Sequence, residues 1–276
     1  MGNSDRAMVP RAPGRRRSPA IITALLALAI VAPLPAMAAG TAPSGADVAA
    51  VDARAAYTLD LSARGDFVAQ TTFVQCVGAS MQMMLNMIRA KDDRTGRTQR
   101  SLQVLARSLS GARPDGIQRK GASVRGWTSG LNTLSAGPYR TVGEPTLQAA
   151  VKQAAKAMRD TGRPVGLLVW RGRHAWVMAG FRATADPKLT DDFKVLQVIV
   201  MDPLYPYGSA VWGPSPKPRQ AISVSQLGRQ FVPRSTRNFQ AGGGTSAASA
   251  WSQSLSGKYV IVMPYTPTTV SLRHRA

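Results

Sequence analysis

Cysteine and histidine are scarce in this chain, which narrows the chemistry that it can perform. Cys76 is the only cysteine and His174 and His274 are the only histidines among 276 residues. One cysteine excludes a disulfide within the chain and a four-cysteine zinc site. A thiol can act as a nucleophile when an imidazole takes its proton. His274 lies in an arginine-rich tail, so Cys76 and His174 form the candidate pair, and we expect no metal or cofactor.

A carboxylate follows one of the apolar runs and is a candidate partner for the histidine. Asp202 comes directly after Val198–Met201 and before Pro203. An acidic side chain just past a strand can accept the second N–H of an imidazole and orient the ring. Asp-Pro is also an ordinary way to open a turn. Asp191 and Asp192 are competitors, but they lie in a polar segment.

A glutamine precedes the cysteine by six residues. The carboxamide of Gln70 could join the backbone amide of Cys76 in stabilising a tetrahedral oxyanion. Gln75 is the alternative, although its adjacency to the cysteine favours another direction for its side chain. The four candidate residues therefore occur in the order Gln70, Cys76, His174 and Asp202. The plain alternative for the thiol is an inert, buried side chain.

Helical periodicity places the cysteine at the start of a helix. Apolar residues recur at helical spacing across 76–90, at Val77, Met81, Met84, Leu85 and Ile88. The exposed amides and dipole of a helix N-terminus stabilise a thiolate. We expect a shorter helix over 101–110, and another from Leu147 to Met158, between Pro145 and Gly162.

Short apolar runs dominate the second half of the chain and predict strands. They are Val165–Trp170, Ala175–Phe181, Val195–Met201 and Tyr259–Met263. Residues 240–250 are rich in glycine and predict a mobile surface loop. Helices followed by a mostly antiparallel sheet predict the α+β class, with one domain over residues 57–268.

Three sequence segments together resemble the papain-like cysteine peptidases, and more narrowly the bacteriocin-processing (double-glycine) peptidase-like family. They are Gln70–Ser80, Gly172–Phe181 and Val200–Pro203. The resemblance covers roughly residues 57–265. It implies a papain-like fold with Cys76 as nucleophile, His174 as base, Asp202 as orienting residue and Gln70 as oxyanion donor. The sequence departs from the family after the nucleophile, where Val77 and Gly78 replace Gly-Pro, and it carries no transporter.

The N-terminus has the layout of a secretory signal. Five arginines precede the thirteen apolar residues Ala20–Ala32, and Ala36-Met37-Ala38 forms an A-x-A cleavage site. A 13-residue helix is about 20 Å long, too short for a hydrocarbon core of about 30 Å. We therefore expect a signal peptide over 1–38, a flexible leader over 39–56 and secretion. Without cleavage, the segment would anchor the protein in the membrane.

The chain is strongly basic, with 35 Lys and Arg against 14 Asp and Glu and a formal charge of +21. Such a surface attracts anionic polymers. The basic residues are scattered, including those of the tail 269–276, so we expect no specific nucleic-acid partner and no stable transmembrane span after cleavage. An anionic cell-wall polymer is the alternative partner.

These observations predict a secreted thiol hydrolase that cleaves a peptide or protein substrate. Two alternatives stay open at this point. One is a cell-wall amidase or a transglutaminase-like thiol enzyme, and the other is a non-catalytic binding module that uses its basic surface.

Overall fold

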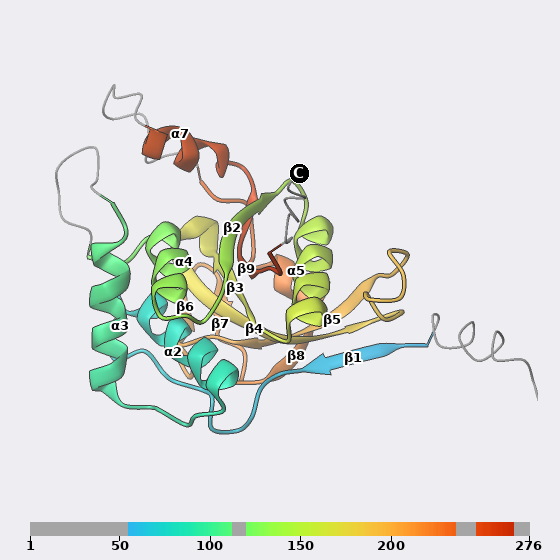
Figure 1. Ribbon diagram of the computed structural model, residues 1–276, viewed down its shortest axis with the longest axis horizontal. Coiled ribbons are helices and arrows are strands. Elements are labelled where there is room, and N and C mark those ends of the chain that lie inside the picture. The colour runs from blue at the N-terminus through green and yellow to red at the C-terminus, as the bar shows by residue number, and fades with distance from the viewer. Residues whose placement is uncertain (1–54, 112–119, 236–246, 268–276) are drawn as a thin grey trace, which may run out of the picture. The chain divides into compact units, whose positions relative to one another are not determined.

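The central element of the protein is an antiparallel β-sheet. In this computed structural model, residues 55–111, 120–235 and 247–267 are described, and within them seven strands form one sheet in the order β2-β9-β3-β4-β5-β8, with β1 paired to β4 (Figure 1). These strands are β1 (Tyr57–Asp60), β2 (Tyr139–Glu144), β3 (Val165–Val169), β4 (His174–Ala183), β5 (Val195–Met201), β8 (Gln220–Ser223) and β9 (Tyr259–Pro264). A separate two-stranded hairpin, β6 (Gly208–Ser209) and β7 (Gly213–Pro214), follows β5.

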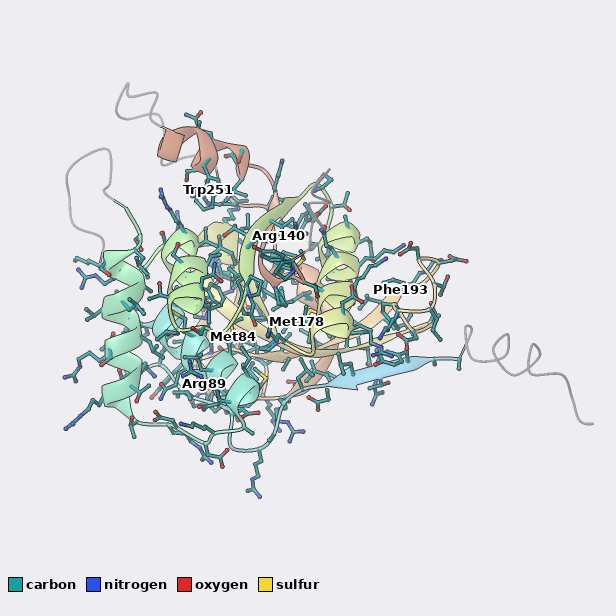
Figure 2. The ribbon with its side chains drawn as sticks, viewed as in Figure 1. Met84, Arg89, Arg140, Met178, Phe193 and Trp251 are labelled. Carbon is teal, nitrogen blue, oxygen red and sulfur yellow. The ribbon has the colours of Figure 1, made fainter. Side chains whose placement is uncertain are left out.

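Helices cover both faces of this sheet. They are α2 (Cys76–Arg89), α3 (Gly96–Ser108), α4 (Val124–Thr133), α5 (Leu147–Thr161), α6 (Val224–Gly228) and α7 (Ala247–Ser254). A one-turn 3-10 helix, η1 (Trp170–Gly172), joins β3 to β4. Arg89 at the C-terminal end of α2 (Figure 2) donates a hydrogen bond of 2.6 Å to the Leu134 carbonyl, which joins α2 to the end of α4.

The longest strand, β4, organises the sheet. Its first half pairs with β3 and its second half pairs with β1 along the same edge, while β5 pairs along the other edge. Alternate β4 residues face opposite layers: Ala175 and Val177 belong to the cluster with α2, whereas Trp176 and Met178 belong to the cluster with α5. Both layers are therefore tied to the strand that begins at His174.

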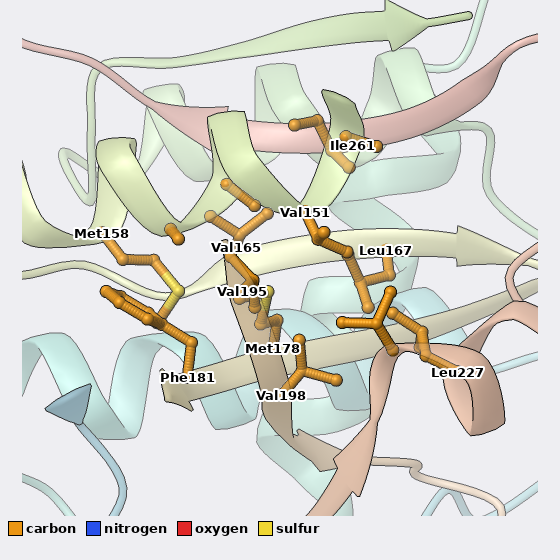
Figure 3. Close-up of a cluster of buried hydrophobic side chains, with 14 of the residues drawn as sticks. Val151, Met158, Val165, Leu167, Met178, Phe181, Val195, Val198, Leu227 and Ile261 are labelled. Atoms are coloured by element: carbon orange, nitrogen blue, oxygen red, sulfur yellow. The ribbon is translucent and has the colours of Figure 1, made fainter. Parts of the chain in front are cut away.

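Two hydrophobic clusters fill the space on either side of the sheet. The side chains of α2, α3 and α4 meet one face, and those of α5 and α6 meet the other. Figure 3 shows the second cluster, with Val151 and Met158 of α5 near Val165 and Leu167 of β3. The α+β prediction, with helices packed on a mostly antiparallel sheet, is confirmed.

Some predicted elements have other bounds in the structure, and some observed elements were not predicted. The helix expected over 101–110 begins at Gly96 and ends at Ser108, because the Thr95 side chain caps its N-terminus. The loop expected over 240–250 is partly wrong, since α7 begins at Ala247. The sequence analysis did not predict β1, β2, β8, α4 or α6.

The signal segment 1–38, nearly all of the leader 39–56 and the tail 269–276 lie outside the described residues. Across the described ranges, no helix is both long enough and apolar enough to cross a membrane.

Candidate active site

Cys76 is the first residue of α2 and is partly exposed. The first four amides of a helix have no acceptor within the helix. Here the amide of Gly78 donates to the Gln103 side chain (2.9 Å) and that of Ala79 to the Gln75 carbonyl (3.0 Å). Within the described residues, the amides of Cys76 and Val77 make no such bond. They are the groups at this helix end that can still bind an anion.

Two buried glutamines of α3 hold the loop that leads to the cysteine. The Gln99 side chain accepts from the amide of Thr71 (2.8 Å) and donates to the Ala69 carbonyl (2.9 Å). The Gln103 side chain binds the amide of Gly78 and donates to the carbonyl two residues before Cys76 (2.9 Å). The loop backbone is thus satisfied by side chains, and the start of α2 is fixed against α3.

Gly78 allows these helices to come close together. A Cβ atom at this position would lie 2.8 Å from the Gln99 carbonyl oxygen and 2.9 Å from the Gln103 Cβ. A larger residue would therefore push α3, and the two glutamines, away from the loop before the cysteine.

His174 and Asp202 form a buried pair at the end of neighbouring strands. His174 is 4% exposed and Asp202 is fully buried. Nε2 of the imidazole lies 2.7 Å from Oδ1 of the carboxylate. The last β4–β5 pair is Val177 with Met201, so Asp202 lies one residue beyond the ladder and diagonal to His174 on the same face. The same Oδ1 accepts the amide of Leu204 at 2.8 Å, which fixes the carboxylate.

The α2 helix brings the cysteine to the other side of this imidazole. The Ser80 hydroxyl donates to the Ala175 carbonyl (3.2 Å), which places the first turn of α2 beside the start of β4. Cys76 lies one turn before Ser80 on the same helix face, and His174 lies one residue before Ala175. The thiol is close enough to raise the pKa of His174, and since Nε2 is bonded to Asp202, Nδ1 is the ring nitrogen that remains for it.

The environment of His174 favours its charged form. Burial is the largest single influence and lowers the pKa of His174, but hydrogen bonds to Asp202 and Cys76 and the charges of both groups together outweigh it. The resulting pKa is about 9, above the ordinary histidine value of 6.5. The surroundings of His174 therefore favour its charged imidazolium form.

Gln70 lies close to the site without a direct contact to the thiol or the imidazole among the described hydrogen bonds. Its backbone amide donates to the Pro203 carbonyl (2.7 Å), next to Asp202. Its side-chain Nε2 donates to the Thr72 carbonyl (3.1 Å), and its Oε1 is buried without a hydrogen-bond partner. The Gln75 side chain accepts from the Thr71 hydroxyl.

The other candidates lie elsewhere. Asp191 pairs with Lys156 at the surface, and Asp192 is exposed. His274 lies outside the described residues. Within the described part of the chain, no three histidine, cysteine or acidic side chains are grouped as a metal site would require.

The sequence analysis did not identify Gln99 and Gln103 as residues that hold the loop before Cys76. The spacing of these glutamines could have indicated a shared role, since two residues four positions apart lie on one face of a helix. Their partners are backbone atoms of a distant loop, which no residue pattern marks.

The arrangement has the parts needed for acyl transfer: a nucleophile, a base that is oriented by a carboxylate, and free amides at a helix N-terminus. Comparisons of the chain with protein-family models, curated proteins and solved structures found no match.

Proposed function

We propose that this protein is a cysteine peptidase-like thiol hydrolase with a papain-like arrangement of its α+β fold. The observation that carries the proposal is the buried imidazole of His174, which has Asp202 on Nε2 and Cys76 as its second partner. A buried histidine with a purely structural role needs a hydrogen-bond acceptor only for the single N–H of its neutral ring. A partly exposed thiol on the other nitrogen, at a helix N-terminus, is the geometry of an activated nucleophile.

The acylation step follows from this geometry. The Cys76 sulfur attacks the carbonyl carbon of the peptide bond, and the C–O π electrons move to the oxygen. The amides of Cys76 and Val77, together with the second N–H of the Gln70 carboxamide, stabilise this oxyanion. When the oxyanion collapses, the C–N bond breaks and Nδ1 of His174 gives its proton to the leaving nitrogen. The products are a free amine and a thioester on Cys76.

The deacylation step returns the enzyme to its starting state. Nδ1 of the now neutral His174 takes a proton from a water molecule as the water oxygen attacks the thioester carbon. Collapse of the second tetrahedral intermediate breaks the C–S bond and releases the carboxylic acid product. The thiolate and the imidazolium are restored, and Asp202 keeps the ring oriented through both steps.

The expected signal segment leads us to propose a secreted enzyme that meets extracellular peptides or proteins. The basic composition would also allow it to associate with anionic cell-wall polymer.

Alkylation and peptide hydrolysis test the proposal. Iodoacetamide should label Cys76 of the full chain at pH 6 much faster than it labels a free thiol, because the imidazolium stabilises the thiolate. A mixed peptide library should be cleaved by the wild type. Cys76→Ser should lower cleavage by at least about three orders of magnitude.

Ser108→Ala is the control, since it removes an exposed hydroxyl at the end of α3. It should keep both activities. Slow alkylation of the wild type together with no cleavage of any peptide would instead favour the binding-module alternative.

A further inference from the structure

The face of the catalytic imidazole is covered by an indole ring. Trp170 and His174 are stacked with ring centroids 4.2 Å apart and an interplanar angle of 24°. Because Val169 pairs with His174 in the β3–β4 ladder, the two rings lie at opposite ends of the tight connection between these strands. This contact involves neither the hydrogen bonds of the imidazole nor its thiol partner.

The backbone that carries this indole adopts an unusual conformation. Trp170, Arg171 and Gly172 have φ values of 56°, 57° and 88°. Residues with a Cβ rarely enter this left-handed region, and two in succession require compensation. Left-handed residues that the surrounding structure holds in place occur preferentially at functional sites.

Gln230 supplies the compensation and holds the indole. Its side-chain Oε1 accepts from the Trp170 Nε1 at 2.9 Å, and its backbone carbonyl accepts from the Trp170 amide, also at 2.9 Å. Its Nε2 donates to the Pro214 carbonyl at 3.2 Å, on the hairpin that follows Asp202. One side chain therefore connects the stacked indole to the segment after the orienting carboxylate.

We propose that Trp170 is a positioning residue: its indole, held by Gln230, covers one face of His174 and keeps the ring where Nε2 meets Asp202 and Nδ1 meets Cys76. A ring face over a desolvated cation also stabilises the imidazolium. This inference rests on the proposed function. The charged groups that interact with the ring are Asp202 and Cys76, and the exposed Arg171 and Arg173 belong to the same turn.

The test measures alkylation of Cys76 by iodoacetamide as a function of pH, together with peptide kcat/KM, in the full chain. Trp170→Ala should slow alkylation at pH 6 on the order of tenfold, and should shift the acid limb of the alkylation profile to higher pH by about one unit. The reason is that the imidazolium, and with it the thiolate, loses stabilisation. Trp170→Phe keeps an aromatic face and should remain close to the wild type.

Gln230→Ala loosens the indole without removing it and should shift the profile in the same direction by less. It carries the test if Trp170→Ala does not fold. Trp251→Ala is the matched control, because it removes an indole on α7 that has no contact with His174 among the described ring contacts (Figure 2).

A lower melting temperature with an unchanged alkylation profile, in folded Trp170→Ala or in Gln230→Ala, would overturn the inference alone and leave the indole a packing residue. Slow alkylation of the wild type with no peptide cleavage would overturn the proposed function and this inference with it.

Discussion

Nε2 of His174 lies 2.7 Å from Oδ1 of Asp202, and this bond determines which ring nitrogen remains for the thiol of Cys76. The carboxylate is itself held by the Leu204 amide. The ring therefore has little freedom to rotate, so in the proposed mechanism the direction of proton transfer is set before a substrate binds.

The charge of His174 can be measured directly. Because its folded pKa of about 9 exceeds the unfolded value near 6.5, the charged ring stabilises the fold fully below about pH 6.5. This stabilisation is lost as the pH rises through about 9. Imidazole resonances, assigned by their loss in His174→Gln, should titrate near pH 9. The difference in melting temperature between wild type and His174→Gln should shrink over the same range.

Asp202→Asn and Asp202→Ala separate orientation from charge. Asn keeps an oxygen acceptor for Nε2 of His174 and for the Leu204 amide, but loses the charge, so kcat/KM should fall partly. Ala also frees the ring and leaves the Leu204 amide without its acceptor, so kcat/KM should fall further, with a loss of about 1–3 kcal/mol in stability. Asp192→Asn, at an exposed position, is the control. Unchanged kcat/KM in folded Asp202→Ala would remove Asp202 from the proposed triad and leave a dyad of Cys76 and His174.

Gln70→Ala tests the proposed oxyanion donor. Loss of one donor should lower kcat by about 10²–10³, with the alkylation of Cys76 unchanged. Gln75→Ala, the matched control, should have a smaller effect. If Gln70→Ala lowers only the melting temperature, the Gln70 side chain supports the loop through its bond to Thr72, and the amides of Cys76 and Val77 form the oxyanion site by themselves.

Gln103→Ala tests the support of the nucleophile by α3. It removes two hydrogen bonds and leaves the Gly78 amide and a loop carbonyl unsatisfied. We expect a loss of about 2–4 kcal/mol in stability, from two hydrogen-bond deletions, and a fall in kcat/KM in the folded fraction. Gln253→Ala on α7, where the side chain is exposed, should change neither quantity. Equal kcat/KM in folded Gln103→Ala would limit the glutamine to a structural role.

The sequence predicted elements with strong local patterns. The helix that begins at Cys76 and the strand Val195–Met201 were predicted within a residue of their observed bounds, because apolar periodicity and flanking turn residues mark them. The α+β class followed from their order. The strand Tyr139–Glu144 was not predicted, because it is only partly buried and carries little alternation.

The candidate site was predictable only as residue types in an order. Rarity of cysteine and histidine selected Cys76 and His174, and an apolar run pointed to Asp202. The supports of these residues, namely Gln103 beneath the loop and Trp170 over the imidazole, were not predicted. They depend on contacts between segments that are far apart in sequence, and the local residue pattern does not predict such contacts.

The bond between the Gln70 amide and the Pro203 carbonyl joins the segment before the nucleophile to the segment after β5. Such contacts between distant segments form only when the chain has closed its largest loops, which is the slow part of folding. The thiol of Cys76 meets its imidazole through another such contact, the docking of α2 against the start of β4. Fast thiol alkylation at acidic pH would therefore report that α2 has docked on β4, whereas a partly folded chain would carry a cysteine of ordinary reactivity.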